Sequence, residues 1–527
     1  MFEYAYIEKH ELDNENIPVY KYNSVDIRDK MDFGILKLKT KKNDNMKIEP
    51  LNMYIHFTID YSGSMNEHTK PYDTKLDVVL QTVKDIIHFL ATKCRNDENM
   101  SICFGIDSFN NEYCELFSKR KIPTTEYEMF IFESEFKNKN KAFGDTNIEL
   151  ALTESTKKIN AYKEEYPTHK ILHFFLTDGH PTRGELSNTL LSKLVNKDTP
   201  TVYMGYGKEH NSKLLQCLSQ QSSIGSSYEY IHDFEKITDV CGEVLHKYLY
   251  SCLNSFSLKC NGCRCLIYDS NKNTWVTELY QGTCSYEQEL VYSLLLENSD
   301  IESAMPISVD VIENDVVIET ITTPLIDNQT NLSVYIFRQQ VIELLKLVGD
   351  YDDVINYHKF KEYKSNMNEL FRKMRGYMKT DVCIEDDKKM LNVLCDDLYI
   401  SYMTIGTDLG NMCTISRQTT HSRQTSYRIH LDVDELTQPY IYDKNASQIS
   451  RSQSYYSDHD SDSQLDSQSD SQSDSFLENL NEIQDKETQV LEYEEEHDIQ
   501  TYNYQATQDL LYSPNIRRTI CEIHRNT

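Results

Sequence analysis

Hydrophobic and polar positions follow two different periods along the first half of the chain. Runs of consecutive apolar residues, the pattern of strands buried on both faces, occur at Met53–Ile59, Met100–Phe109, Lys170–Thr177 and Thr201–Gly205. Between these runs, apolar residues recur every three to four positions, as in the amphipathic segment Lys75–Leu90. Alternation of strands with helices predicts an α/β fold, a Rossmann-like doubly wound sheet, over residues 51–253.

The same periodicity predicts the remaining elements of this domain. Tyr113–Ser118 is expected to return as a short antiparallel edge strand, and Tyr228–His232 as a further strand. We expect helices at Thr146–Tyr162, Glu185–Val195, Ser212–Gln220 and Phe234–Leu253.

Residues 254–330 change to short β-type runs separated by polar turns such as Asp269–Asn273. This pattern predicts a small antiparallel β-sandwich. Residues 1–50 are polar apart from Gly34–Lys39, which alternates apolar and charged positions. Because the segment has too little apolar content to fold alone, we expect it to add a strand to the sandwich.

Three apolar stripes at helical spacing predict a helical module over residues 331–428. Residues 429–505 are an acidic tail rich in Ser, Asp and Gln, with the literal repeat Ser467–Asp474, and we expect them to be disordered. Serines beside acids suit an acid-directed kinase, a possible partner of the tail. Apolar character returns in residues 506–527, a short segment that we expect to dock back on the folded part.

Charge and composition restrict the function classes. The chain has 527 residues and a net charge of −30, which argues against nucleic acid as a partner because phosphate binding needs a basic surface. No apolar run reaches the ~18 residues of a membrane span, and the start lacks the basic-then-apolar pattern of a signal peptide. We therefore expect an intracellular, cytoplasmic protein whose 14 cysteines are free thiols.

Three separated motifs carry candidate metal-ligating oxygens. They are Asp60-x-Ser62-x-Ser64 after the first predicted strand, Gly144-Asp145-Thr146-Asn147 before a helix, and Thr177-Asp178-Gly179 after the central strand. The carboxyl ends of strands in a doubly wound sheet share one edge, where ligands bind. Hard divalent cations prefer oxygen ligands, and Mg²⁺ takes about six of them. The three motifs therefore predict a shared cation site.

Together these motifs resemble the metal-ion-dependent adhesion site (MIDAS) of von Willebrand factor type A (VWA) domains, over roughly residues 51–253. The resemblance implies a bound Mg²⁺ or Mn²⁺ held by the hydroxyls of Ser62, Ser64 and Thr146, with Asp60 and Asp178 acting mostly through water. It also implies that an acidic residue of a partner protein completes the shell. Neutral hydroxyls leave the charge of the ion under-compensated, which agrees with attraction of an anionic ligand.

One position departs from the family pattern. Asp145 stands where the family usually has glycine, and an additional acid beside the ion would tighten metal binding and weaken its pull on an external carboxylate. Four histidines flank the motifs, and we interpret them as packing or surface residues and not as metal ligands: His56, His68, His173 and His180.

Two further sequence features lie downstream of this domain. Cys260, Cys263 and Cys265 have a spacing that can start a zinc site, but a second pair at matching spacing is missing, and free cysteines on a β-hairpin are the alternative. The β-rich and helical region with the run Ser416–Gln424 resembles the module that follows the VWA domain in Hint (intein-like) proteins and in plant RING-type ubiquitin ligases. Neither a RING array nor an intein nucleophile segment is evident, so no such activity is carried over.

The leading interpretation is a non-enzymatic protein that binds an acidic residue of a partner through the metal. An adaptor of a ubiquitin-ligase system without its own RING is one alternative. A metal-dependent hydrolase is another, and it would need a base in reach of the metal, for which Asp145 is the candidate.

Overall fold

The computed structural model describes residues 2–9, 31–41, 51–70, 73–137, 142–207, 210–231, 244–262, 265–286, 288–297, 307–322, 331–351 and 357–422. The predictions for the acidic tail and for residues 506–527 lie outside these ranges. Within them, no helix is long and apolar enough to cross a membrane.

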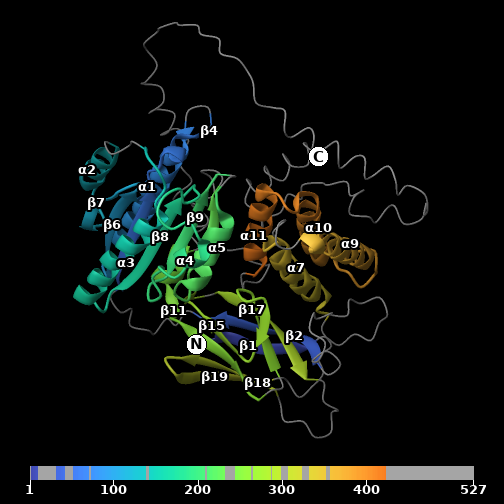
Figure 1. Cartoon of the computed structure of the whole chain (residues 1–527). Helices are drawn as coiled ribbons and strands as arrows, with labels where there is room; N and C mark the ends of the chain where they lie inside the picture. The colour runs from blue at the N-terminus through green and yellow to red at the C-terminus, as the bar shows by residue number, and fades with distance from the viewer. Residues whose placement is uncertain are drawn as a thin grey trace, which may run out of the picture. The chain divides into compact units, whose positions relative to one another are not determined.

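A mainly parallel sheet forms the centre of the first domain (Figure 1). In the described residues its order is β10-β9-β8-β3-β6-β7, and only β7 runs antiparallel to its neighbour. The strands are β3 (Leu51–Asp60), β6 (Met100–Phe109), β7 (Tyr113–Lys121), β8 (Lys170–Thr177), β9 (Thr201–Tyr206) and β10 (Ser227–Ile231). Because β3 lies between β6 and β8 in parallel register, the segments that follow β3 and β8 emerge side by side at one edge.

Helices cover both faces of this sheet, as the doubly wound prediction requires (Figure 1). On one face, α1 (Lys75–Asn96) and α2 (Glu126–Lys137) bury residues such as Val83 and Phe132 against the apolar side chains of β3 and β6. On the other face, α3 (Ile148–Glu165), α4 (Asn188–Leu191) and α5 (Ser212–Gln221) pack on Phe175 and Tyr203. A 3₁₀ turn, η2 (Gly63–Asn66), and the hairpin β4 (His68–Lys70) and β5 (Asp73–Thr74) connect β3 to α1.

The helix predicted at Glu185–Val195 is wrong in length, because only the single turn α4 is helical. The Glu185 carboxylate accepts hydrogen bonds from the amides of Leu186 and Ser187, at 2.9 and 2.7 Å, and these local bonds compete with a helical start. The prediction of a helix to Leu253 is also wrong at its end. Ser251–Leu253 is a strand, β11, paired with β16 (Cys284–Ser285), and residues 232–243 lie outside the described ranges.

Two antiparallel sheets form the predicted β-sandwich and share one apolar core that includes Leu38, Leu258 and Val309. One has the order β1-β2-β17-β13-β14 in the part described and contains β1 (Phe2–Lys9), β2 (Met31–Thr40), β17 (Glu289–Glu297), β13 (Cys265–Asp269) and β14 (Thr274–Val276). The other has the order β15-β12-β18-β19 and contains β15 (Glu278–Gln281), β12 (Phe256–Cys260), β18 (Ser308–Glu313) and β19 (Val316–Thr322). The N-terminal segment thus supplies two described strands, β1 and β2, where the sequence predicted one.

The helical module contains α7 (Ser333–Gly349), η4 (Tyr357–Lys359), α9 (Phe360–Tyr377), α10 (Glu385–Thr404) and α11 (Asp408–Ser422). Its last helix packs on the first domain, where Ile415 joins the core around α5 and Gln216 Nε2 donates to the side-chain Oε1 of Gln418 at 3.3 Å. Within the module, the fully buried Arg417 guanidinium lies 2.6 Å from the Asp397 carboxylate. The Ser416–Gln424 run therefore begins inside a packed interface.

Candidate metal site

The turn after β3 holds the first three predicted ligands. Asp60 ends the strand and is buried, and its Oδ1 accepts a hydrogen bond from the Ser62 amide at 2.8 Å. The Ser62 and Ser64 hydroxyl oxygens lie 3.1 Å apart. One carboxylate and two hydroxyls are thus gathered on one short turn, as the Asp-x-Ser-x-Ser spacing predicts.

The end of β8 adds the second carboxylate. Ser64 Oγ donates to Asp178 Oδ1 at 2.8 Å, which joins the two motifs directly. Thr177 donates its hydroxyl to Asp60 Oδ2 at 2.6 Å and accepts from the Gly179 amide at 3.1 Å. Thr177 therefore orients the Asp60 carboxylate from the neighbouring strand, a positioning role that the sequence analysis did not assign.

The third motif reaches the same place from the loop before α3. A Cβ added to Gly179 would lie 3.4 Å from Thr146 Oγ1 and 3.8 Å from Asp60 Oδ2, so the Thr146 hydroxyl and the buried carboxylate both border this glycine. The Gly63 amide donates to the Gly144 carbonyl at 3.0 Å, and the Thr146 amide donates to Thr182 Oγ1 at 2.8 Å. These backbone bonds fix the loop, and the five predicted ligands converge at the carboxyl edge of the sheet.

The charge at this edge fits a divalent cation. Burial and the nearby Asp178 carboxylate raise the pKa of Asp60 to about 7, although the Thr177 and Ser62 hydrogen bonds oppose the rise. Holding Asp60 ionised inside the protein is therefore unfavourable without a compensating positive charge. The donor set of two carboxylates and three hydroxyls consists of hard oxygen ligands, which suit Mg²⁺ or Mn²⁺.

Asp145 lies at the rim of the site, with its side chain 56% exposed. Its amide donates to Asn111 Oδ1 at 2.6 Å, and its carboxylate lies 4.0 Å from the Arg183 guanidinium. The exposed cation offsets part of the charge of this acid. Its effect on metal binding stays a prediction.

One cation at the site was missed by the sequence analysis. The Lys75 ammonium, at the start of α1, lies 2.9 Å from Asp178 Oδ2 and also donates to the Glu67 carboxylate. The available signal was a lysine in the first turn of a predicted helix, a position where the helix dipole disfavours positive charge.

Within the described ranges, the other candidate ligands do not gather into a metal site. The described residues contain no group of three or more His, Cys, Asp or Glu side chains that could hold an ion. Cys260 and Cys265 are both buried, and Cys263 lies outside the described residues, so the choice between a zinc site and free cysteines stays open. His56 and His173 are buried in the sheet, where His56 Nε2 lies 3.1 Å from the Asp107 carboxylate and His173 Nε2 lies 2.9 Å from the Thr58 hydroxyl. His68 and His180 are exposed. Two of these histidines are thus packing residues and two lie at the surface, and the expectation that none of them binds metal stays a prediction.

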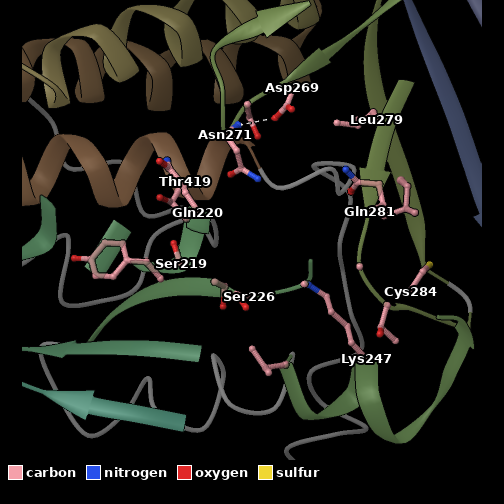
Figure 2. A pocket seen from close by; sticks show the side chains of 18 of the residues that line it. Ser219, Gln220, Ser226, Lys247, Asp269, Asn271, Leu279, Gln281, Cys284 and Thr419 are labelled. Atoms are coloured by element: carbon pink, nitrogen blue, oxygen red, sulfur yellow. Dashed lines mark hydrogen bonds between the residues drawn. The ribbon is translucent and has the colours of Figure 1, made fainter. Parts of the chain in front are cut away.

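A cavity of about 250 Å³ lies away from the metal site, between α5, β10, the sandwich and α11. Figure 2 shows polar side chains around it, among them Gln220, Lys247 and Thr419, with the Asn271 amide bonded to the Asp269 carboxylate at 3.1 Å. None of the five predicted ligands lines this cavity. It is a junction between modules and takes no part in the cation site.

Comparisons with known proteins agree with the fold. Residues 55–242 match the family described as von Willebrand factor type A domain. A von Willebrand factor type A protein from Catenulispora acidiphila superposes with a TM-score of 0.50 at 11% identity, covering 80% of this chain and 96% of that one. The ArnB paralog VWA2 from Sulfolobus acidocaldarius gives a TM-score of 0.44 at 14% identity, covering 80% and 98%.

Proximal thread matrix protein 1 from the mussel byssus, in a structure with a zinc-occupied MIDAS motif, gives a TM-score of 0.27 at 18% identity, covering 38% and 46%. No curated protein matches the chain. At 11% identity, the likeness to the Catenulispora acidiphila protein shows the fold alone. Domains of the matched family commonly mediate metal-dependent protein interactions through the MIDAS. The chain contains a von Willebrand factor type A domain at residues 55–242.

Proposed function

We propose that this domain binds Mg²⁺ or Mn²⁺ through Asp60, Ser62, Ser64, Thr146 and Asp178, and through the ion an acidic residue of a partner protein. The observation that carries the proposal is that the Ser64 hydroxyl bonds to Asp178, while the Thr146 hydroxyl and the Asp60 carboxylate both border Gly179. The ion would supply positive charge that the buried Asp60 carboxylate lacks, and its neutral hydroxyl ligands leave charge available for an external carboxylate.

An exposed aromatic ring at the rim of the site indicates that the acidic residue of the partner has an apolar neighbour. Phe143 exposes 64% of its surface next to the Gly144–Thr146 loop. Its amide donates to the Tyr61 carbonyl at 2.9 Å, and its carbonyl accepts from the Asn110 side chain at 3.0 Å. Because the backbone is held on both sides, the exposed ring is presented at low entropic cost. The partner segment then carries an acidic residue beside a large apolar one.

Metal binding is tested first, by thermal melting of the full chain in Mg²⁺, in Mn²⁺ and in chelator. A bound ion stabilises the folded state by mass action, so the wild type melts higher with metal. Asp60→Ala removes this gain. The matched control is Asp198→Ala, an exposed aspartate just before β9, at the opposite edge of the sheet. Equal melting of the wild type with metal and with chelator contradicts the proposal.

Partner chemistry is tested on an array of acidic peptides, each paired with a version in which Asp or Glu is replaced by Asn or Gln. Binding that requires both the divalent ion and the carboxylate supports the proposal. Phe143→Ser lowers the affinity for peptides with an apolar neighbour and leaves the metal-dependent melting shift unchanged. Binding that survives chelation, or that the amide versions retain, counts against it.

The alternatives have less support. The carboxylate of Asp145, the candidate base of a hydrolase, faces the Arg183 guanidinium at the exposed rim. The role as an adaptor of a ubiquitin-ligase system stays a prediction. The kinase acting on the acidic tail also stays a prediction, because that tail lies outside the described residues.

A further inference from the structure

Lys75 occupies a position that its local structure does not favour. It is the first residue of α1, after Thr74, whose hydroxyl accepts from the Asp77 amide at 3.1 Å as the N-cap. The exposed amides at a helix start carry partial positive charge, so a lysine there is unfavourable, and burying its ammonium adds a desolvation cost. The contacts of the side chain must account for its presence.

The side chain is built into the edge of the sheet. The Lys75 amide donates to the Glu67 carbonyl at 2.9 Å, which fixes the start of the helix against the loop after Ser64. A Cβ added to Gly207, just after β9, would lie 3.0 Å from Lys75 Cε and 3.5 Å from Nζ. The absence of a side chain at Gly207 thus leaves a passage for the lysine to the carboxyl edge.

The passage ends at a proposed metal ligand. Lys75 Nζ lies 2.9 Å from Asp178 Oδ2, and the Asp178 side chain has no exposed surface. The other oxygen of the same carboxylate accepts from Ser64. A single buried carboxylate is therefore shared between a fixed ammonium and the cation site, whereas Asp60 receives hydroxyl and amide donors.

We infer that Lys75 is an internal cation that shares the Asp178 carboxylate with the metal. It thereby lowers the affinity of the site for the metal and raises the affinity of the bound metal for the partner's carboxylate. Without metal, Lys75 neutralises Asp178 and keeps the site folded. With metal, the ammonium would neutralise part of the negative charge that Asp178 offers to the ion. The ion would then be held more weakly and would keep more of its positive charge for an external anion. This inference rests on the proposed metal site.

The experiment is calorimetric titration of Mn²⁺ alone into the full chain, after removal of metal, for the wild type and Lys75→Met. We expect the variant to bind Mn²⁺ at least tenfold more tightly. Lys84→Met, a half-buried lysine two and a half turns further along α1, is the matched control and binds as the wild type does. In chelator, Lys75→Met melts below the wild type because Asp178 is left without a cation, and Mn²⁺ reverses the difference.

The outcomes separate the two proposals. Equal Mn²⁺ affinity of the wild type and Lys75→Met overturns the role of Lys75 and leaves the proposed function standing. Binding by Lys75→Met alone supports the inference and overturns metal-dependent binding by the wild type. Binding by neither overturns both. Lys75→Gln, which keeps a polar group in the passage, repeats the measurement if the methionine variant does not fold in chelator.

Discussion

Replacing Asp60 by asparagine should stabilise the metal-free domain while destroying its response to metal. Burial and Asp178 raise the pKa of Asp60 from 3.8 to about 7. A rise of roughly three pKa units corresponds to about 4 kcal/mol of cost for the ionised form in the folded state. The amide cannot accept every hydrogen bond that the carboxylate accepts from Thr177 and Ser62. This loss destabilises the variant by about 1 kcal/mol or more. The expected net gain in chelator at pH 8 is about 1–3 kcal/mol.

The stability difference between Asp60→Asn and the wild type depends on pH in a way that identifies the raised pKa of Asp60 as its cause. Between the unfolded pKa near 4 and the folded pKa near 7, the native state of the wild type binds more protons than its unfolded state, so its stability falls as pH rises. Asparagine does not titrate. The advantage of Asp60→Asn should therefore be small at pH 5 and reach its full value above about pH 7.

Hydrogen exchange of the β3 and β8 amides, followed by mass spectrometry, measures the stability of this domain within the full chain. In chelator at pH 8, the variant should exchange more slowly, by about tenfold for each 1.4 kcal/mol. In Mn²⁺ the order should reverse, since only the wild type gains a bound ion. Faster exchange of the variant in chelator at pH 8, or a difference that does not change with pH, would refute the reasoning.

Three further predictions concern packing and buried charge. Gly205→Ala should cost about 1–3 kcal/mol, because the new Cβ would lie 2.3 Å from the buried His210 ring. Gly376→Ala in α9 should instead raise the melting temperature, because in the described part of the chain the new Cβ would meet no atom within 4 Å beyond its own helix backbone and chain neighbours. Burial lowers the pKa of His210 to about 4, so its contribution to stability is held above pH 6.5 and lost as pH falls toward 4; His210→Gln should flatten that part of the stability profile, and an unchanged slope would contradict it. Arg417→Met should cost about 3–5 kcal/mol by denaturant unfolding, since the buried Asp397 carboxylate loses the guanidinium 2.6 Å away, and adding Asp397→Leu should recover much of the loss.

Buried strands were predictable because their physics is local. Lys170–Thr177 is a strand with the predicted bounds, and Met100–Phe109 likewise, since a run of apolar residues needs burial on both faces. Helices with weak periodicity were not predictable in this way, and α2 was missed altogether. Two strands that are adjacent in sequence, β14 and β15, belong to different sheets, because β14 pairs with β13 and β15 with β12. Pairing partners of that kind are tertiary information.

The place of two motifs directly after buried strands determined by itself that Asp60, Ser62, Ser64 and Asp178 would share an edge, because parallel strands end on the same side. Thr146 lies in the loop before α3, and the sequence placed it at that edge through the resemblance to the MIDAS pattern. Tertiary structure alone decided which neighbours set the charge and orientation of these groups. Lys75 meets Asp178 across 103 positions of sequence, and Thr177 meets Asp60 across 117. Such contacts depend on where side chains end in space, which periodicity along the chain does not encode.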